Sequence, residues 1–170
     1  MRVGVIGCGS ISSTYLENSK RFEEFEIVSC ADKDMNSAIT RCDETKIGNA
    51  VHIEELLADE TIDLVINLTP PSAHVKVSTM ILEAGKHLYS EKPIALTSEE
   101  GQKLIQLAER KRLKIGCAPD TFLGAACQTA KKIIESGKIG EPTSFIASMT
   151  CPGHERWHPN PEKKKKKGGG

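Results

Sequence analysis

Short apolar runs rich in β-branched residues alternate along this chain with longer segments of mixed polarity. The runs lie at residues 2–6, 25–31, 63–68, 86–90 and 113–117. Each run is predicted to be a buried parallel strand, because a strand that is covered on both faces is apolar throughout instead of alternating with polar residues. The chain is therefore expected to consist of strands separated by helix-sized segments.

Helices are predicted between these strands, at residues 11–21, 53–58, 71–84 and 98–111. The proline pair at residues 70 and 71 starts the third helix, Gly85 ends it, and Thr97 with Glu100 forms a capping box before the fourth. Residues 39–51 are predicted to hold the end of a helix and a short strand. Strands and helices that alternate on this scale predict an α/β fold, a doubly wound parallel sheet with right-handed crossovers.

The first predicted strand ends in a glycine-rich turn, G-C-G-S-I-S at residues 7–12. Gly7 permits a tight strand-to-helix turn, and Gly9 lets a pyrophosphate approach the backbone, where the free N–H groups of the next helix can hold it. Ser12 replaces the third glycine of the dinucleotide fingerprint; it is small enough for close helix packing but weakens the match. The alternative is a glycine turn that binds no ligand.

Asp32 follows the second predicted strand, roughly 20 residues beyond the glycines, where the ribose hydroxyl of an adenosine would be accepted. A carboxylate at this position repels a 2′-phosphate, so Asp32 favours NAD over NADP, although Lys33 offsets part of that preference. The alternative for Asp32 is the N-cap of the next helix, a position that Asp also favours. Its spacing and its place at a strand end favour the ribose role.

Two further loops, Thr69 to His74 and Glu91 to Pro93, also follow predicted strands. In a doubly wound sheet, ligands bind beyond the carboxyl ends of the strands. The glycine turn, Asp32 and these two loops are therefore predicted to meet in one crevice.

Composition argues against several other classes of protein. The formal charge is zero, so no overall basic field indicates a nucleic-acid partner, and no apolar stretch is long enough to cross a membrane. The six cysteines show no C-x-x-C spacing and no signal peptide precedes Met1, a pattern that favours reduced thiols in the cytoplasm. No histidine pairs with a cysteine or carboxylate at metal-ligand spacing, so no metal is expected. Cys8 lies inside the glycine turn, where it either packs as a small hydrophobe or is sensitive to oxidation.

The alternation changes near residue 120, where we place a domain boundary. Residues 122–136 are predicted to form a longer helix, followed by a strand at residues 143–149 that opens a different sheet. Residues 121–161 are too few for an independent core and are expected to begin a second α/β domain. The lysines and glycines of residues 162–170 are expected to be a disordered tail, a scar at the end of the chain in preference to a nucleic-acid or lipid-binding arm.

The motifs together resemble those of one known family. They are G-C-G-S-I-S at 7–12, T-P-P-S-A-H at 69–74, E-K-P at 91–93 and S-G-K-I-G-E-P at 136–142. In this order they resemble the glycine turn, the loop after the fourth strand, the hallmark motif and the approach to the second domain of the Gfo/Idh/MocA family of NAD(P)-dependent oxidoreductases. The resemblance implies a Rossmann domain at residues 1–120 that binds NAD, with NADP as the second option, and homo-oligomers among full-length relatives.

By this resemblance Lys92 is the catalytic lysine, placed near the nicotinamide and the hydroxyl group that is oxidised. A positioned ammonium stabilises the developing alkoxide or relays its proton; the alternative is a solvated surface lysine. The Lys92–Pro93 bond is often cis in similar proteins, which would direct the lysine into the cleft. The implied cofactor-binding residues are Gly7, Gly9, Ser10, Ile11, Asp32, Thr69, His74, Glu91 and Lys92. A buried structural role for His74 and a helix-starting role for Thr69 remain alternatives.

Three functions are compatible with these residues. The first is hydride transfer between a nicotinamide cofactor and a sugar, polyol or related secondary alcohol. Family members usually add a histidine, commonly with an aspartate, from the second domain; this chain ends before such a motif, and His154 and His158 are not placed to substitute. The second hypothesis is therefore a catalytically silent dinucleotide-binding module. A methyltransferase also uses a glycine loop and a second-strand acid, but E-K-P and the glycine spacing argue against it.

Overall fold

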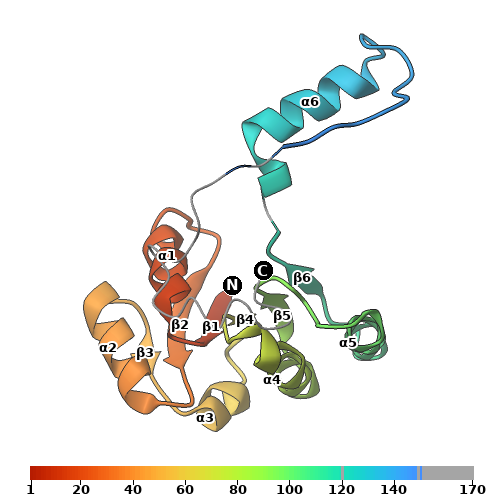
Figure 1. Cartoon of the computed structure of the whole chain (residues 1–170). Coiled ribbons are helices and arrows are strands. Elements are labelled where there is room, and N and C mark those ends of the chain that lie inside the picture. Colours follow the sequence, from red (N-terminus) through yellow and green to blue (C-terminus); the bar gives the residue numbers. More distant parts are fainter. Residues whose placement is uncertain (120, 149, 151–170) are drawn as a thin grey trace. The chain divides into compact units, whose positions relative to one another are not determined.

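The computed structural model describes residues 1–119, 121–148 and 150, and its internal contacts divide the chain after Ala118. The unit Met1–Ala118 is a six-stranded sheet in which every pair of neighbouring strands is parallel (Figure 1). The predicted doubly wound α/β fold is therefore confirmed.

The strands and helices of this unit follow one another in strict alternation. The strands are β1 (Arg2–Ile6), β2 (Glu26–Ala31), β3 (Asn49–Ala50), β4 (Leu64–Asn67), β5 (His87–Ser90) and β6 (Ile115–Cys117). The helices are α1 (Ser10–Ser19), α2 (Met35–Thr45), α3 (Ile53–Ala58), α4 (Pro71–Glu83) and α5 (Ser98–Arg110). The order across the sheet is β3-β2-β1-β4-β5-β6, so the chain reverses its direction of winding at β1.

Local sequence signals explain where the helices begin and end. The prolines fall at the start of α4, and Gly85 follows its last turn with a φ of 77°. Thr97 and Glu100 form the predicted capping box before α5, since the Thr97 side chain accepts the Glu100 N–H and the Glu100 carboxylate accepts the Thr97 N–H. The segment that reads least clearly, residues 39–51, contains the end of α2 and the two residues of β3.

The sheet is covered by one apolar layer on each face. Val3 and Val5 of β1 belong to the apolar cluster that includes residues of α1 and α2, whereas Ile6 of the same strand belongs to the cluster that includes residues of α3, α4 and α5. This is the alternation of side chains that a pleated strand imposes. Because both faces are covered, the strands have no polar side and appear in the sequence as continuous apolar runs.

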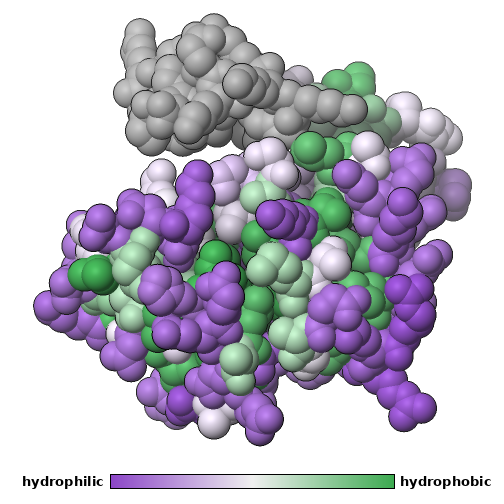
Figure 2. Space-filling view, turned by 90° about the horizontal axis from the view of Figure 1, so that it is seen from below, coloured by the Kyte–Doolittle hydropathy of each residue, from purple (hydrophilic) through white to green (hydrophobic). Residues whose placement is uncertain are grey.

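Hydrophilic side chains border a central strip of hydrophobic ones on the face shown in Figure 2. Some apolar surface is ordinary for a folded chain. No helix in the described part of the chain is long and apolar enough to cross a membrane.

The second unit contains a short 3₁₀ helix, Thr121–Leu123, and α6 (Ala125–Glu135). The predicted helix at 122–136 is therefore interrupted at Gly124, which caps α6. The predicted strand at 143–149 is wrong for its described residues, 143–148, which form no strand. A strand requires a neighbour to pair with, and no described segment of this unit is a strand. The expected tail at 162–170, with His154 and His158, lies outside the described residues.

Candidate functional site

The glycine turn joins β1 to α1 at the carboxyl edge of the sheet. Gly7 has a φ of 107°, and a Cβ at this position would lie 2.6 Å from the backbone carbon of Leu68, so only glycine fits. The Gly7 N–H donates to the carbonyl oxygen of Ala31 at 2.8 Å, which ties the turn to β2. At Gly9, by contrast, a Cβ would meet no atom within 4 Å. The turn is thus closely packed at its first glycine and open at its second.

The amino end of α1 faces this open position. Gly9 is the N-cap, no side chain caps the helix, and its first turn holds no acidic residue. The Ser12 N–H donates to the Gly9 carbonyl at 3.1 Å. The first N–H groups of a helix generally have no partner within it, so those of Ser10 and Ile11 are suited to an anion such as a pyrophosphate. Ser12 is fully buried and its hydroxyl donates to the Gly9 carbonyl at 2.6 Å. The residues of this turn therefore fit a dinucleotide phosphate.

The Asp32 carboxylate stands directly after β2 and binds the glycine turn. One of its oxygens accepts the Cys8 N–H at 2.8 Å, and the other accepts the Asp34 N–H at 3.0 Å. The N-cap alternative for Asp32 is wrong, because Asp34 caps α2 and accepts the Asn36 N–H at 3.2 Å. Each carboxylate oxygen has a second lone pair, so Asp32 retains capacity to accept a hydroxyl of a ligand.

Arg41 of α2 is a residue of this site that sequence reasoning missed. Its guanidinium donates to the Gly9 carbonyl at 3.3 Å and pairs with Glu44 at 2.7 Å, while its Nε is buried without a hydrogen-bond partner. Arg41 borders an open pocket of about 280 Å³, which is lined by Cys8, Asp34, Asn36, Ser37, Thr40 and Arg41. No motif contains Arg41; only the packing of α2 beside the turn reveals it.

His74 joins the loops that follow β4 and β5. The residue is 1% exposed; its Nε2 lies 2.6 Å from the Thr69 carbonyl oxygen and its Nδ1 lies 2.5 Å from that of Pro93. Asn67 supports the same loop, because its side chain accepts the N–H and the hydroxyl of Thr69 and donates to the His74 carbonyl. These surroundings correspond to the alternative in which His74 has a buried structural role.

Glu91 joins α1 to the loop after β5. Its carboxylate accepts the Tyr15 hydroxyl at 3.0 Å and the Lys92 N–H at 2.9 Å, and its own N–H donates to the Asn67 carbonyl at 2.9 Å. The Lys92–Pro93 bond is cis, as the family resemblance predicts, and the Lys92 side chain is exposed. Tyr15, like Arg41, belongs to no motif and is brought to this site by its helix.

The strands that carry these loops end in register. Ile6 of β1 is paired with Ala31 of β2 and with Asn67 of β4, and Asn67 is paired with Ser90 of β5. The glycine turn, Asp32, the Thr69 loop and Glu91 therefore follow four adjacent strand ends at one edge of the sheet. Within the described ranges, no cluster of three or more His, Cys, Asp or Glu side chains is suited to a metal ion.

A glycine turn, a second-strand acid and further loops at the same edge of a parallel sheet define the class of Rossmann-type nucleotide-binding domains. Residues 1–118 match the model of the oxidoreductase family with an NAD-binding Rossmann fold, Gfo/Idh/MocA. The chain belongs to this family.

Individual relatives agree with this assignment. An uncharacterised oxidoreductase of Schizosaccharomyces pombe is 36% identical over 124 residues, which are 72% of this chain and 34% of that protein. The 1,5-anhydro-D-fructose reductase of Ensifer adhaerens is 28% identical over 160 residues, 92% of this chain and 48% of the reductase. The crystal structure of an NAD-binding oxidoreductase from Klebsiella pneumoniae matches with a TM-score of 0.77 at 28% identity, covering 84% of this chain and 40% of the other. The chain thus spans less than half the length of these relatives.

Proposed function

We propose that this chain binds NAD at the carboxyl edge of β1, β2, β4 and β5 and serves in hydride transfer to or from a sugar, polyol or related secondary alcohol. The observation that carries the proposal is the register that brings four loops with nucleotide-binding chemistry to one edge. The family supports an oxidoreductase that uses a nicotinamide cofactor, and the anhydrofructose reductase supports a sugar as the substrate class.

Different residues bind different parts of the cofactor in this proposal. The N–H groups at the start of α1, with Gly7, Gly9, Ser10 and Ile11, hold the pyrophosphate. Asp32 accepts the adenosine ribose hydroxyl and disfavours a 2′-phosphate, so NAD is preferred and NADP is the second option. The loops of Thr69, His74 and Glu91 line the crevice; of these, His74 acts by holding two loops together.

Lys92 is the proposed catalytic residue. NAD, when bound, supplies the hydride acceptor or donor. Removing a hydride from a carbinol also requires that its hydroxyl proton leave, and an ammonium at the end of β5 would stabilise the alkoxide or take part in moving that proton. The hydrogen bond from the Lys92 N–H to Glu91, which also accepts the Tyr15 hydroxyl, anchors the backbone from which the ammonium extends.

Calorimetric titration of the whole chain with NAD, and separately with NADP, tests the binding half of this proposal. We expect saturable binding of both, with NAD tighter. S-adenosylmethionine serves as the control ligand, because a methyltransferase would use the same glycine turn and second-strand acid. Absence of binding to either dinucleotide would refute the cofactor site, and tight binding of S-adenosylmethionine alone would restore the methyltransferase alternative.

A second candidate is a dinucleotide-binding module without turnover. The observation that favours it is the position of His74, whose two ring nitrogens lie next to the carbonyl oxygens of Thr69 and Pro93, so that this histidine is held in a structural role. We propose that residues 121–161 begin a second domain. Incubation with NAD and a panel of polyols, followed by the absorbance of the reduced nicotinamide, separates the two candidates: turnover that Lys92→Ala abolishes supports the enzyme, and NAD binding without turnover supports the module.

The remaining properties follow from the same proposal. The partner is a small sugar or polyol, with neither nucleic acid nor a membrane required, and the location is the cytoplasm. Homo-oligomers are expected of full-length relatives.

A further inference from the structure

The side chain of Arg41 connects α2 to the carbonyl group at which α1 begins. Arg41 lies in α2, whereas Gly9 is the N-cap of α1. One guanidinium nitrogen, Nη2, donates to the Gly9 carbonyl at 3.3 Å, and another, Nη1, pairs with the Glu44 carboxylate at 2.7 Å. Glu44 lies one turn farther along the same helix and orients the guanidinium. Because Arg41 and Gly9 are 32 residues apart, only the fold brings them together.

The Gly9 carbonyl belongs to a peptide group whose opposite edge carries the Ser10 N–H. This peptide bond is trans, so the carbonyl and the N–H point in opposite directions. The carbonyl also accepts the Ser12 N–H at 3.1 Å and the Ser12 hydroxyl at 2.6 Å. Together with Arg41, these donors fix the direction of the carbonyl. The Ser10 N–H therefore points away from them, out of the amino end of α1.

The charge of Arg41 acts on this peptide group as well. A hydrogen bond from a charged donor is about twice as strong as one between neutral groups, and hydrogen bonds in series polarise one another. The guanidinium draws electron density toward the Gly9 oxygen, which makes the Ser10 N–H a stronger donor. The positive charge also adds to the positive end of the α1 dipole, and no acidic residue in the first turn of α1 offsets it.

We propose that Arg41 is a positioning residue for a phosphate group at the glycine turn. It holds and polarises the peptide group between Gly9 and Ser10, and the Ser10 N–H binds the phosphate. Arg41 acts through the peptide group, without a contact of its own to the ligand. The inference rests on the proposed function, in which the phosphate at this turn is the pyrophosphate of NAD.

The competing explanation is that Arg41 serves only to pack α2 against α1. Its Nε is buried without a hydrogen-bond partner among the described residues, and a buried donor without a partner lowers stability. Methionine retains an apolar side chain of similar path and removes that donor. Arg41→Met should therefore shift the melting temperature by less than about 4 °C. A purely structural arginine would lose stability when it is replaced.

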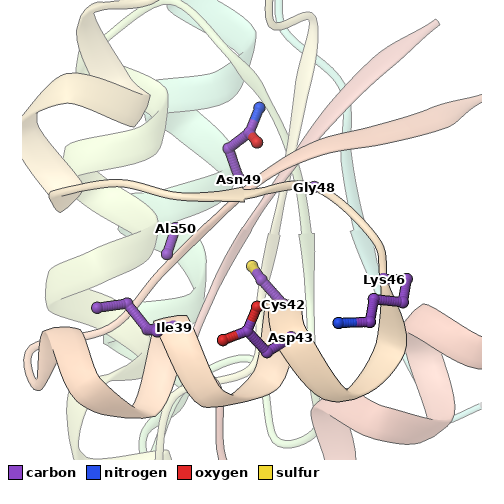
Figure 3. Close-up of a pocket in the computed structure, with 7 residues that line it drawn as sticks. All are labelled: Ile39, Cys42, Asp43, Lys46, Gly48, Asn49 and Ala50. Carbon is purple, nitrogen blue, oxygen red and sulfur yellow. The ribbon is translucent and has the colours of Figure 1, made fainter.

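Lys46 provides a matched control on the same helix. It is the exposed C-cap of α2 and borders a second pocket, of about 350 Å³, which α2 forms with residues 48–50 (Figure 3). That pocket contains no residue of the glycine turn, whereas the pocket that Arg41 borders contains Cys8. Lys46→Met removes one positive charge, as Arg41→Met does, without changing a donor to Gly9.

The carbonyl carbon resonance of Gly9 tests the contact in the labelled whole chain without any ligand. A hydrogen bond to a carbonyl oxygen moves the resonance of its carbon to higher frequency. Arg41→Met should therefore move the Gly9 resonance to lower frequency, and Lys46→Met should leave it in place. An unmoved resonance in Arg41→Met, or a move to higher frequency, would overturn the inference.

Calorimetric titration with NAD tests the consequence for binding. Arg41→Met should weaken NAD binding about tenfold, and Lys46→Met should stay within about twofold of the unmodified chain. Arg41→Lys keeps a cationic donor and should lose less than Arg41→Met. Equal affinities of Arg41→Met and Lys46→Met, or a loss of affinity that accompanies a fall of the melting temperature beyond about 4 °C, would refute the positioning role.

The unmodified chain separates this inference from the proposed function. If it binds no NAD, the proposed function fails and the role of Arg41 fails with it. If it binds NAD and Arg41→Met binds equally well, the proposed function stands and only the role of Arg41 is refuted.

Discussion

The carboxylate of Asp32 accepts the backbone N–H of Cys8 at 2.8 Å. The acid that would select the ribose is thus also a structural support of the turn that would hold the pyrophosphate. Both ends of an adenosine diphosphate moiety would be recognised by groups that contact each other, so a change at one of them alters the other.

Substitution of Asp32 by Asn is expected to reduce the preference of the chain for NAD over NADP. The amide cannot accept a hydrogen bond through its nitrogen and no longer repels a 2′-phosphate, so the preference for NAD over NADP should fall by about tenfold or more. Paired calorimetric titrations measure the two dissociation constants.

Asp43→Asn is the matched control, because it removes the same charge from an exposed position of α2. Its preference should equal that of the unmodified chain. An equal loss of preference in both variants would show that overall charge, and not the position of Asp32, sets the choice.

The two glycines of the turn are expected to respond differently to alanine. Gly7→Ala forces a Cβ onto the Leu68 backbone at a positive φ, so the free energy of unfolding should fall by on the order of 3 kcal/mol. Gly9→Ala meets open space, so stability should change by less than about 1 kcal/mol while NAD affinity falls at least tenfold. Urea unfolding and calorimetry separate the effects; a stable Gly9→Ala chain with unchanged affinity would contradict the phosphate site.

Replacement of His74 tests its bridge between two loops. His74→Phe leaves the carbonyl oxygens of Thr69 and Pro93 without their ring partners, which should lower the free energy of unfolding by on the order of 3 kcal/mol. His74→Gln retains one amide donor group and should lose less. Thermal unfolding measures the difference. His52→Asn is the control, because it changes the exposed N-cap residue of α3 to another residue that can cap a helix. A neutral His74→Phe would show that the bridge does not stabilise the domain.

The Cys30 thiol and, to a smaller extent, the Arg41 guanidinium lower the pKa of Cys8 against the effects of burial and of Asp32, which predicts a specific pH dependence. A thiol with a lowered pKa is a thiolate at lower pH, so its alkylation by iodoacetamide should reach half of its maximal rate at a lower pH than that of Cys42 or Cys117, whose pKa values burial raises. Arg41→Gln removes a positive charge that favours the thiolate, so the Cys8 profile should move to higher pH. Peptide-resolved alkylation rates measure each thiol; an unshifted Cys8 profile would exclude the Arg41 effect.

Local signals made much of this domain predictable from its sequence. The glycine turn, the capping box at Thr97 and the proline start of α4 depend on neighbouring residues, and the structure contains them as predicted. The apolar runs revealed the strands because both faces of the sheet are covered. Register and the order of the strands then follow from the doubly wound fold.

Other features depend on contacts between distant residues. Arg41 and Tyr15 contact the turn and Glu91 through the packing of whole helices, so no spacing in the sequence marks them. The common apolar layer of Cys8, Cys30 and Cys42 is hidden for the same reason. The predicted strand is wrong at its described residues, 143–148, because β-branched and aromatic residues favour a strand only where another strand is available to pair.

The central place of β1 in the sheet has a consequence for synthesis of the chain. β1 pairs with β2 on one edge and with β4 on the other. During translation the edge of β1 that pairs with β4 stays unpaired until Leu64–Asn67 has left the ribosome, although β1 itself emerges much earlier. Nascent chains that stall within this interval would present the unpaired backbone edge of an apolar strand to chaperones, or to one another.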